Sequence, residues 1–460
     1  MENIVKKGQV YDVLIHDIGE NGEGIGRVDG FTVFVDGAVI EDEVKAKIEV
    51  VKKNYAIGKI IKLVKPSPFR IHPMCEYTRK CGGCQIQNID YSMQLQLKTN
   101  KVKANIERIG KIKDAIIHDT IGMDHPYAYR NKAQFPVGMK DGQVQIGFYQ
   151  KKSHNIIDLH NCYIQDEMNA KIIKVIRDYI NNYNVPNYNE KSGKGIIRHI
   201  VTKVAFSTKD IMVVIVTNGR ELPKKDILIE NLLEEVPNIK SIVQNINSKK
   251  GNVVLGRECI TLYGEEKIID TIGTLKFNIS PLSFFQVNPI QTKVLYEKAL
   301  EYASLSGEEV VYDIYCGIGT ISLFLAQKAK KVYGIEIVPQ AIEDAKENAK
   351  LNDVENVEFF AGAAEEVVPR LYKEGILADV VVVDPPRKGC DEKVLDTIVK
   401  MNPEKIVYVS CNPSTLARDL KYLDENGYKT MEVQPVDMFP HTGHVETIIM
   451  MTKCGSEGKK

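Results

Sequence analysis

The chain has 460 residues, of which 43% are hydrophobic, which predicts about three domains at ~150 residues each and excludes a small disulfide scaffold. Its 61 Lys and Arg balance its 61 Asp and Glu, so no overall positive field marks it as a nucleic-acid binder. The charge is uneven, because residues 1–65 hold 10 basic and 11 acidic side chains, 66–210 hold 22 and 13, and 211–460 hold 29 and 37. The basic middle suits either one face that meets a polyanion or ordinary solvated lysines.

No apolar run reaches the ~18 residues of a membrane span, and the first residues, MENIVKKGQVYD, lack the apolar core of a signal peptide. We therefore expect a cytoplasmic protein with no membrane partner. Nine cysteines in a reducing compartment indicate metal ligands, nucleophiles or buried small side chains rather than disulfides. Nothing in the pattern demands a partner subunit, so we expect a monomer.

Residues 1–66 alternate short β-rich runs with glycine turns and predict a small five-stranded, OB-like β-barrel. The G-x-G-x-G spacing at 22–26 is followed by the strand-like run FTVFV rather than by a helix, so it predicts hairpin glycines and not a dinucleotide loop. The KPSP stretch at 65–68 then indicates a linker, because its prolines favour extended backbone.

Residues 69–282 open with a cysteine cluster, continue with a helix near 91–124 that we expect to pack on the C-terminal domain, and then mix strands with helices. Residues 283–454 alternate strands of β-branched residues with amphipathic helices, which predicts a parallel sheet covered on both faces. The predicted fold class is therefore α/β, with an N-terminal barrel, a mixed α/β centre and a C-terminal parallel sheet. Residues 455–460 are a polar tail.

The run DIYCGIGT at 313–320 lies between a predicted strand and a predicted helix, where its glycines let the backbone approach a ligand at the helix N-terminus. Glu336 follows Gly317 by 19 residues at the end of the next strand, where a carboxylate accepts hydrogen bonds from a ribose diol. Two glycines without a third, preceded by Tyr315 and a cysteine, favour S-adenosylmethionine over NAD. A tight connection without a ligand is the alternative.

Two more motifs end buried strands of the same predicted sheet. Asp384 follows the run DVVVV and Cys411 follows KIVYV, which places both at the edge where ligands bind in open α/β sheets. A thiolate at Cys411 could add to an electron-poor ring carbon, although cysteine is also a common buried residue. Glu446 stands just before the apolar run TIIMM, where burial in the crevice would raise its pKa and suit it to act as a general base.

The run SFFQVN at 283–288 combines aromatic rings with amides. Asn288 is explained as a helix N-cap followed by proline, whereas Phe284 and Gln286 have no such explanation. His441 and His444 have a glycine between them and no third ligand near by in the sequence, which favours turn residues over a metal site.

Cys75, Cys81 and Cys84 cluster around glycines, and Cys162 is a fourth candidate ligand. Three clustered cysteines are typical of a metal site. Their spacing fits tetrahedral zinc and an iron-sulfur cluster equally, because both take four thiolates. Radical enzymes that use S-adenosylmethionine have the tighter C-x3-C-x2-C pattern with one open iron, whereas Cys162 would close the fourth position.

Taken in order, CEYTRKCGGC with Cys162, SFFQVN, DIYCGIGT, DPPRKG, SCNP and HVE resemble the motifs of bacterial RNA 5-methyluridine methyltransferases, specifically the 23S ribosomal RNA branch. The resemblance covers essentially the whole chain. It implies an RNA-binding TRAM domain at 1–66, a [4Fe-4S] cluster on the four cysteines, and a Rossmann-like S-adenosylmethionine-dependent methyltransferase domain at 283–454. The tRNA-specific bacterial branch usually lacks the first two features, which favours 23S ribosomal RNA as the partner.

The resemblance also implies roles for single residues. Cys411 would be the nucleophile that adds to uracil C6, and Glu446 would be the base that removes the C5 proton. The residues at positions that contact S-adenosylmethionine would be Gln286, Tyr315, Gly317, Thr320, Glu336 and Asp384.

Thr320 stands where relatives can have asparagine, and Ala363 stands where an acid is usual; both are departures from the family pattern. Because both faces of the uracil ring must be reached, the uridine has to leave its stack. Phe284 is a candidate to hold the unstacked base, and Arg130 and Lys132 are candidates to contact the RNA.

Two alternatives remain open. Methylation of a tRNA uridine would use the same catalytic motifs. A non-catalytic RNA-binding ribosome assembly factor with a decayed cofactor pocket is suggested by Ala363, although the intact Cys411, Glu446 and Asp384 speak against it.

Overall fold

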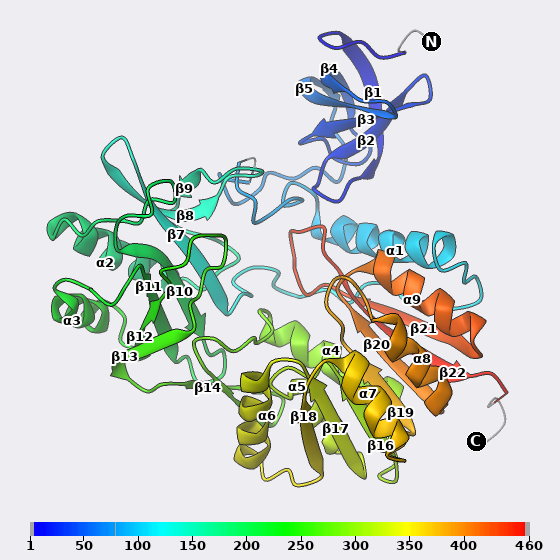
Figure 1. Ribbon diagram of the computed structural model, residues 1–460. Coiled ribbons are helices and arrows are strands. Elements are labelled where there is room, and N and C mark those ends of the chain that lie inside the picture. The colour runs from blue at the N-terminus through cyan, green and yellow to red at the C-terminus, as the bar shows by residue number, and fades with distance from the viewer. Residues whose placement is uncertain (1–3, 79, 456–460) are drawn as a thin grey trace.

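The computed structural model describes residues 4–78 and 80–455, and its strands form a closed barrel, two large sheets and a hairpin (Figure 1). The barrel confirms the predicted five-stranded architecture, with the order β1-β2-β3-β5-β4 around a core that includes Val13, Val33 and Ala46. Gly26 lies in a strand, where an added Cβ would come 2.1 Å from the Val13 side chain. The strands are β1 (Val10–Ile18), β2 (Gly24–Val28), β3 (Phe31–Asp36), β4 (Glu43–Val51) and β5 (Tyr55–Lys65).

A seven-stranded sheet forms the middle part of the chain, in the order β13-β12-β11-β10-β7-β8-β9. Every residue of β10 and β11 is buried, because helices α2 and α3 cover one face while α4 and the β14-β15 hairpin pack on the other. The strands are β7 (Lys132–Lys140), β8 (Gln143–Tyr149), β9 (Ile156–Asp158), β10 (Ile197–Val204), β11 (Ile211–Thr217), β12 (Ile239–Ile246), β13 (Glu258–Gly264), β14 (Ile268–Ile272) and β15 (Leu275–Ile279). The helices are α2 (Met168–Asn182), α3 (Lys225–Glu235) and α4 (Pro289–Ala303).

The C-terminal sheet has eight strands in the order β18-β17-β16-β19-β20-β22-β21-β6. The chain builds outward from β16 to β18 and then returns to the other side of β16 with β19, so a topological switch point lies between β16 and β19. Strand β22 is antiparallel and inserts between β20 and β21. The strands are β6 (Ile116–Ile117), β16 (Val310–Ile314), β17 (Lys331–Glu336), β18 (Val357–Ala361), β19 (Val380–Val383), β20 (Lys405–Ser410), β21 (Tyr428–Val436) and β22 (Glu446–Lys453).

Helices cover both faces of this sheet, which confirms the α/β class. Core residues of α4, α5 and α6 lie in one apolar cluster, and those of α7, α8, α9 and α1 lie in another on the opposite face. The remaining helices are α1 (Tyr91–Arg108), α5 (Thr320–Ala326), α6 (Pro339–Leu351), α7 (Ala364–Lys373), α8 (Glu392–Met401) and α9 (Pro413–Glu425).

Helix α1 lies along α9, below the barrel in the view of Figure 1, and buries Val102 and Ile106 against the C-terminal sheet's helical layer. The helix is shorter than the predicted 91–124. It ends at Arg108 because Gly110 and Lys111, the latter in the left-handed region at φ 60°, turn the chain toward β6.

No helix within 4–78 and 80–455 is long and apolar enough to cross a membrane. Of the predicted polar tail, residues 456–460 lie outside the described residues.

Candidate active site at the carboxyl edge of the C-terminal sheet

The predicted nucleophile and the predicted base meet at one edge of the C-terminal sheet. Strand β20 ends at Ser410, which pairs with Thr447 of the antiparallel strand β22. Cys411 is therefore the next residue along one strand, and Glu446 the preceding residue along its partner. Asp384 reaches the same edge because it directly follows β19, the other neighbour of β20.

The protonation of Cys411 and Glu446 is set by burial and by the charges of neighbouring residues. Glu446 is 5% exposed, and burial together with the charge of Asp384 raises its pKa to about 8. Burial, Glu446 and Asp384 raise the pKa of Cys411 to about 11. Arg387 opposes both shifts. The resting site therefore holds a thiol and a carboxyl group that can change protonation near neutral pH.

Arg387 is a site residue that the sequence analysis did not single out. It is the last residue of the DPPR motif, and its charge acts on both Cys411 and Glu446. Its backbone carbonyl accepts hydrogen bonds from Asn412 Nδ2 and Thr415 Oγ1, each at 3.1 Å. These bonds tie the loop after β19 to the start of α9. The available signal was its position in the DPPR motif, which directly follows the buried strand β19.

The turn from β16 into α5 is strained in the manner of a ligand-binding loop. Tyr315 has a φ of 73°, which is costly for a side chain of this size. Gly317, at φ 55°, faces open space, whereas a Cβ on Gly319 would press on Ala345 and Phe359 at 3.1 Å. Glu336 closes the turn, because its Oε2 accepts a hydrogen bond from the Gly317 N–H at 3.2 Å.

Among the residues that the structure describes, no Lys or Arg forms an ion pair with the carboxylates Asp313 and Asp384 at the switch point. Burial, with the charge of Glu336 adding to it, raises the pKa of Asp313 to about 7. Its Oδ1 is buried without a hydrogen-bond partner among the described residues, while its Oδ2 accepts from Ser322 Oγ at 2.5 Å. Burial and the neighbouring Asp313 likewise raise the pKa of Asp384 to about 7. A ligand that carries positive charge would relieve this repulsion, and the sulfonium and ammonium groups of S-adenosylmethionine supply it.

An apolar platform follows Glu336 directly, and the sequence analysis missed it. Ile337 is 62% exposed and Val338 is 50% exposed. Two exposed aliphatic side chains beside a carboxylate that can hold a ribose suit the flat ring of an adenine. Ala363, at the N-cap of α7, offers no side-chain cap hydrogen bond.

The other predicted cofactor and base contacts lie on the neighbouring elements. Thr320 begins α5, and its Oγ1 is 2.9 Å from the Tyr296 hydroxyl. Gln286 lies in the segment before α4, where its carbonyl accepts from Asn131 Nδ2 at 2.9 Å. The ring of Phe284 is 67% exposed. Asn288 caps α4 through its side chain, as predicted.

The four predicted metal ligands lie together around one cavity of about 340 Å³ in the central region. Those residues are Cys75, Cys81, Cys84 and Cys162. Burial, with the neighbouring cysteines adding to it, raises the pKa of Cys162 to about 11. Among residues 4–78 and 80–455, no three His, Cys, Asp or Glu side chains are grouped tightly enough to hold a single metal ion.

Arg130 and Lys132 line this same cavity and are half-buried. Burial lowers the pKa of Lys132, and the charge of Arg130 lowers the pKa of Cys84 against the effect of burial. The structure thus places both cations beside the cysteines. Their contact with RNA stays a prediction.

Comparisons with known proteins place the chain in a family. The model of the tRNA (uracil-5-)-methyltransferase family matches residues 90–454, and that of the TRAM domain matches 5–61. The chain belongs to the tRNA (uracil-5-)-methyltransferase family and is an S-adenosylmethionine-dependent RNA uracil-C5 methyltransferase with an N-terminal TRAM domain.

Relatives and a solved structure agree with this assignment. A protein of Clostridium tetani described as an uncharacterized RNA methyltransferase is 56% identical over 99% of both chains. One of the same description from Caldanaerobacter subterraneus subsp. tengcongensis is 52% identical, covering 98% of this chain and all of the relative. The Pyrococcus abyssi tRNA (uracil-54, C5)-methyltransferase, solved in complex with S-adenosyl-L-homocysteine, superimposes with a TM-score of 0.77 at 29% identity over 96% of this chain and 99% of that one.

Proposed function

We propose that this protein transfers a methyl group from S-adenosylmethionine to C5 of a specific uridine in 23S ribosomal RNA through a covalent adduct of Cys411 with uracil C6. The observation that carries the proposal is the position of Cys411 beside Glu446 at the sheet edge, with Asp384 next to both. The contacts to the methyl donor are assigned to Gln286, Tyr315, Gly317, Thr320, Glu336 and Asp384.

The chemistry begins at Cys411. Uracil C5 is too weak a nucleophile to take a methyl group unaided, so the Cys411 thiolate adds to C6 and the ring becomes an enolate. The enolate carbon C5 then attacks the sulfonium methyl, which leaves S-adenosylhomocysteine. Phe284, with its exposed ring, is assigned to stack on the unstacked uracil.

Glu446 completes the reaction. Its carboxylate accepts the C5 proton, the C5–H electron pair forms the C5=C6 double bond, and the C6–S bond breaks with its electrons returning to Cys411 sulfur. Because burial raises the pKa of Glu446 to about 8, the protonated product state is stable until the proton leaves to solvent.

We also propose that the four cysteines hold a [4Fe-4S] cluster with a structural role. Each thiolate of such a cluster binds a different iron, so its sulfur atoms surround a shared volume rather than one ion. The four cysteines line one cavity of about 340 Å³, which supports one shared site for all four, and the family resemblance favours the iron-sulfur cluster over tetrahedral zinc. The proposed domains are the TRAM domain at 1–66, the cluster domain at 69–282 and the methyltransferase domain at 283–454.

Methylation of tRNA is the second candidate. The Pyrococcus abyssi neighbour acts, by its description, on a tRNA uracil and matches almost the full length of this chain. The presence of both the barrel and the cysteine cavity favours ribosomal RNA, because the tRNA-specific bacterial branch usually lacks both.

The test is methyl transfer from labelled S-adenosylmethionine, under anaerobic conditions, to unmodified 23S ribosomal RNA and to unmodified tRNA, followed by nucleoside analysis. Label in 5-methyluridine from ribosomal RNA is the expected result. Label from tRNA alone would overturn the substrate and keep the reaction. A Glu446→Gln variant should accumulate an RNA adduct that survives denaturing electrophoresis, and a Cys411→Ala variant, which binds RNA, should form none.

A further inference from the structure

A nine-residue loop, 437–445, links β21 to β22 and leads directly into Glu446. The last residue pair of the β21-β22 ladder is Val436 with Glu446. The backbone of Glu446 therefore has the ladder on one side and this loop on the other. Any movement of the 437–445 loop acts first on the last pair of the ladder.

Six of the nine carbonyls of this loop accept hydrogen bonds from its surroundings, and the donors come from distant parts of the chain. Five donors are side chains of α4 and its N-cap residue, of α1 and of the segment before β7, and two are backbone amides that directly follow Cys84. The bonds run from Gln291 Nε2 to Asp437 O (3.2 Å), Asn288 Nδ2 to Met438 O (3.1 Å), Lys98 Nζ to Phe439 O (3.1 Å), Tyr129 Oη to Pro440 O (3.1 Å), Gln85 N and Ile86 N to His441 O (3.0 and 3.1 Å), and Lys101 Nζ to Gly443 O (3.0 Å).

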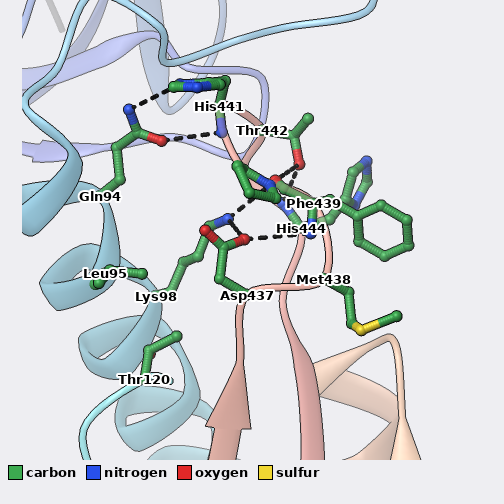
Figure 2. Close-up of polar contacts among 12 residues, drawn as sticks. Gln94, Leu95, Lys98, Thr120, Asp437, Met438, Phe439, His441, Thr442 and His444 are labelled. Atoms are coloured by element: carbon green, nitrogen blue, oxygen red, sulfur yellow. Dashed lines mark hydrogen bonds and ion pairs between the residues drawn. The ribbon is translucent and has the colours of Figure 1, made fainter. Parts of the chain in front are cut away.

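Figure 2 shows Lys98 reaching from helix α1 to Asp437 and the start of the loop. Its ammonium group lies 2.5 Å from Asp437 Oδ1 in addition to its bond to Phe439 O. The Lys98 and Asp437 side chains are 2% and 0% exposed. The other carboxylate oxygen of Asp437 accepts from the Tyr91 hydroxyl at 2.9 Å, so helix α1 holds both oxygens.

A role in positioning the loop explains the buried Lys98–Asp437 ion pair better than a contribution to the stability of the fold does. Removing two charges from water costs about as much as their attraction returns, so a pair of well-packed apolar residues would stabilise the fold equally well. An ion pair differs in being directional, because a misplaced loop would leave a charge buried and unpaired. Gln94, one helical turn before Lys98, adds a second directional contact by accepting from the His441 N–H at 3.0 Å.

We propose that Lys98 is a positioning residue for proton removal: its ion pair with Asp437 fixes the 437–445 loop and thereby holds Glu446 over the C5 proton. This inference rests on the proposed role of Glu446 as the base. It assigns to α1, a helix far from Glu446 in sequence, a part in one step of the reaction. Loss of the pair should leave adduct formation by Cys411 intact and slow the step that releases it.

The experiment compares Lys98→Met with the double variant Lys98→Met/Asp437→Asn. The double variant leaves no unpaired buried charge, so it keeps the test usable if the single variant folds poorly. Lys103→Met is the matched control, because Lys103 lies on the same helix, is exposed and pairs with Glu107 of that helix at 4.0 Å. Rapid-quench single turnovers with RNA and labelled S-adenosylmethionine measure adduct formation and product release separately, and filter binding measures RNA affinity.

The expected result is product release that is slower by between about tenfold and a hundredfold, with methylated adduct accumulating, while adduct formation and RNA affinity stay near the wild-type values. The Lys103→Met control should release product normally. Normal release by a folded double variant would overturn the inference, as would an equal loss of adduct formation and release, which indicates a merely structural role. If Glu446→Gln accumulates no RNA adduct, the proposed role of Glu446 as the base is wrong. If Glu446→Gln accumulates the adduct and the Lys98 variants do not, only the proposed role of Lys98 is wrong.

Discussion

The pKa values of Cys411 and Glu446 predict how each chemical step depends on pH. Both groups must lose a proton before they act, Cys411 to add to the ring and Glu446 to accept the C5 proton. Their pKa values are raised to about 11 and about 8. Both steps should therefore accelerate as the pH rises, but they should do so over different ranges.

The magnitudes follow from these values. Between pH 6.5 and 8.5 the thiolate fraction of Cys411 rises ~100-fold, because the whole range lies below its pKa. The ionised fraction of Glu446 rises from about 3% to about 76%, or ~25-fold, and begins to level off above pH 8. At pH 7.5, forming the thiolate costs about 5 kcal/mol, from 1.36 kcal/mol for each pH unit below the pKa.

The assay separates the two steps by substrate. RNA with 5-fluorouridine at the target position has no C5 proton to remove, so it reports only on the steps up to the methylated adduct. Ordinary uridine RNA in a single turnover reports on release as well. Adduct formation should rise about tenfold per pH unit throughout the range, whereas release should saturate.

Substitution of Arg387 tests the same electrostatic reasoning, because its charge lowers the pKa of both Cys411 and Glu446. In an Arg387→Met variant both pH profiles should move to higher pH, by on the order of one unit. A rate of adduct formation that is flat from pH 6.5 to 8.5, or profiles that move to lower pH in the variant, would refute the electrostatic reasoning.

Two further predictions concern the cofactors. A Cys81→Ser variant purified anaerobically should contain less iron and sulfide than the wild type and unfold at a lower temperature. The control Cys259→Ser, which changes an exposed cysteine of β13, should show neither change. Unchanged iron in the Cys81 variant would contradict the role of Cys81 as a ligand. Asp384→Asn should weaken S-adenosylmethionine binding by between about tenfold and a hundredfold, and S-adenosylhomocysteine binding by less, since the product lacks the sulfonium charge. Calorimetry with both ligands measures the difference, and equal losses would argue against charge recognition.

Strand-end motifs were predictable from sequence because they depend on local patterns. A run of buried β-branched residues followed by a polar residue marks the end of a parallel strand, which is why the sequence alone places Asp384 and Cys411 at one edge of the sheet. The same holds for the barrel, whose alternating runs and glycine turns define its strands. Helix α1 was predicted as a helix, but its end at Arg108 was not, because helix ends depend on a few residues of weak preference.

The pairing of Cys411 with Glu446 was decided by the tertiary structure. It depends on the insertion of β22, antiparallel, between β20 and β21, and the sequence of β22 fixes neither its direction nor its neighbours. The influence of Arg387 on both groups follows from the same arrangement.

By itself, the sequence determined the N-terminal barrel, the α/β class of the C-terminal sheet and the strand ends that carry Asp384 and Cys411. Only the tertiary structure decided which side chains contact each other. Lys98 binds Asp437, 339 residues away, and Arg130 and Lys132 line the cysteine cavity. The physical reason is that strand and helix periodicities are properties of neighbouring residues, whereas ion pairs and cavities form between surfaces brought together by packing.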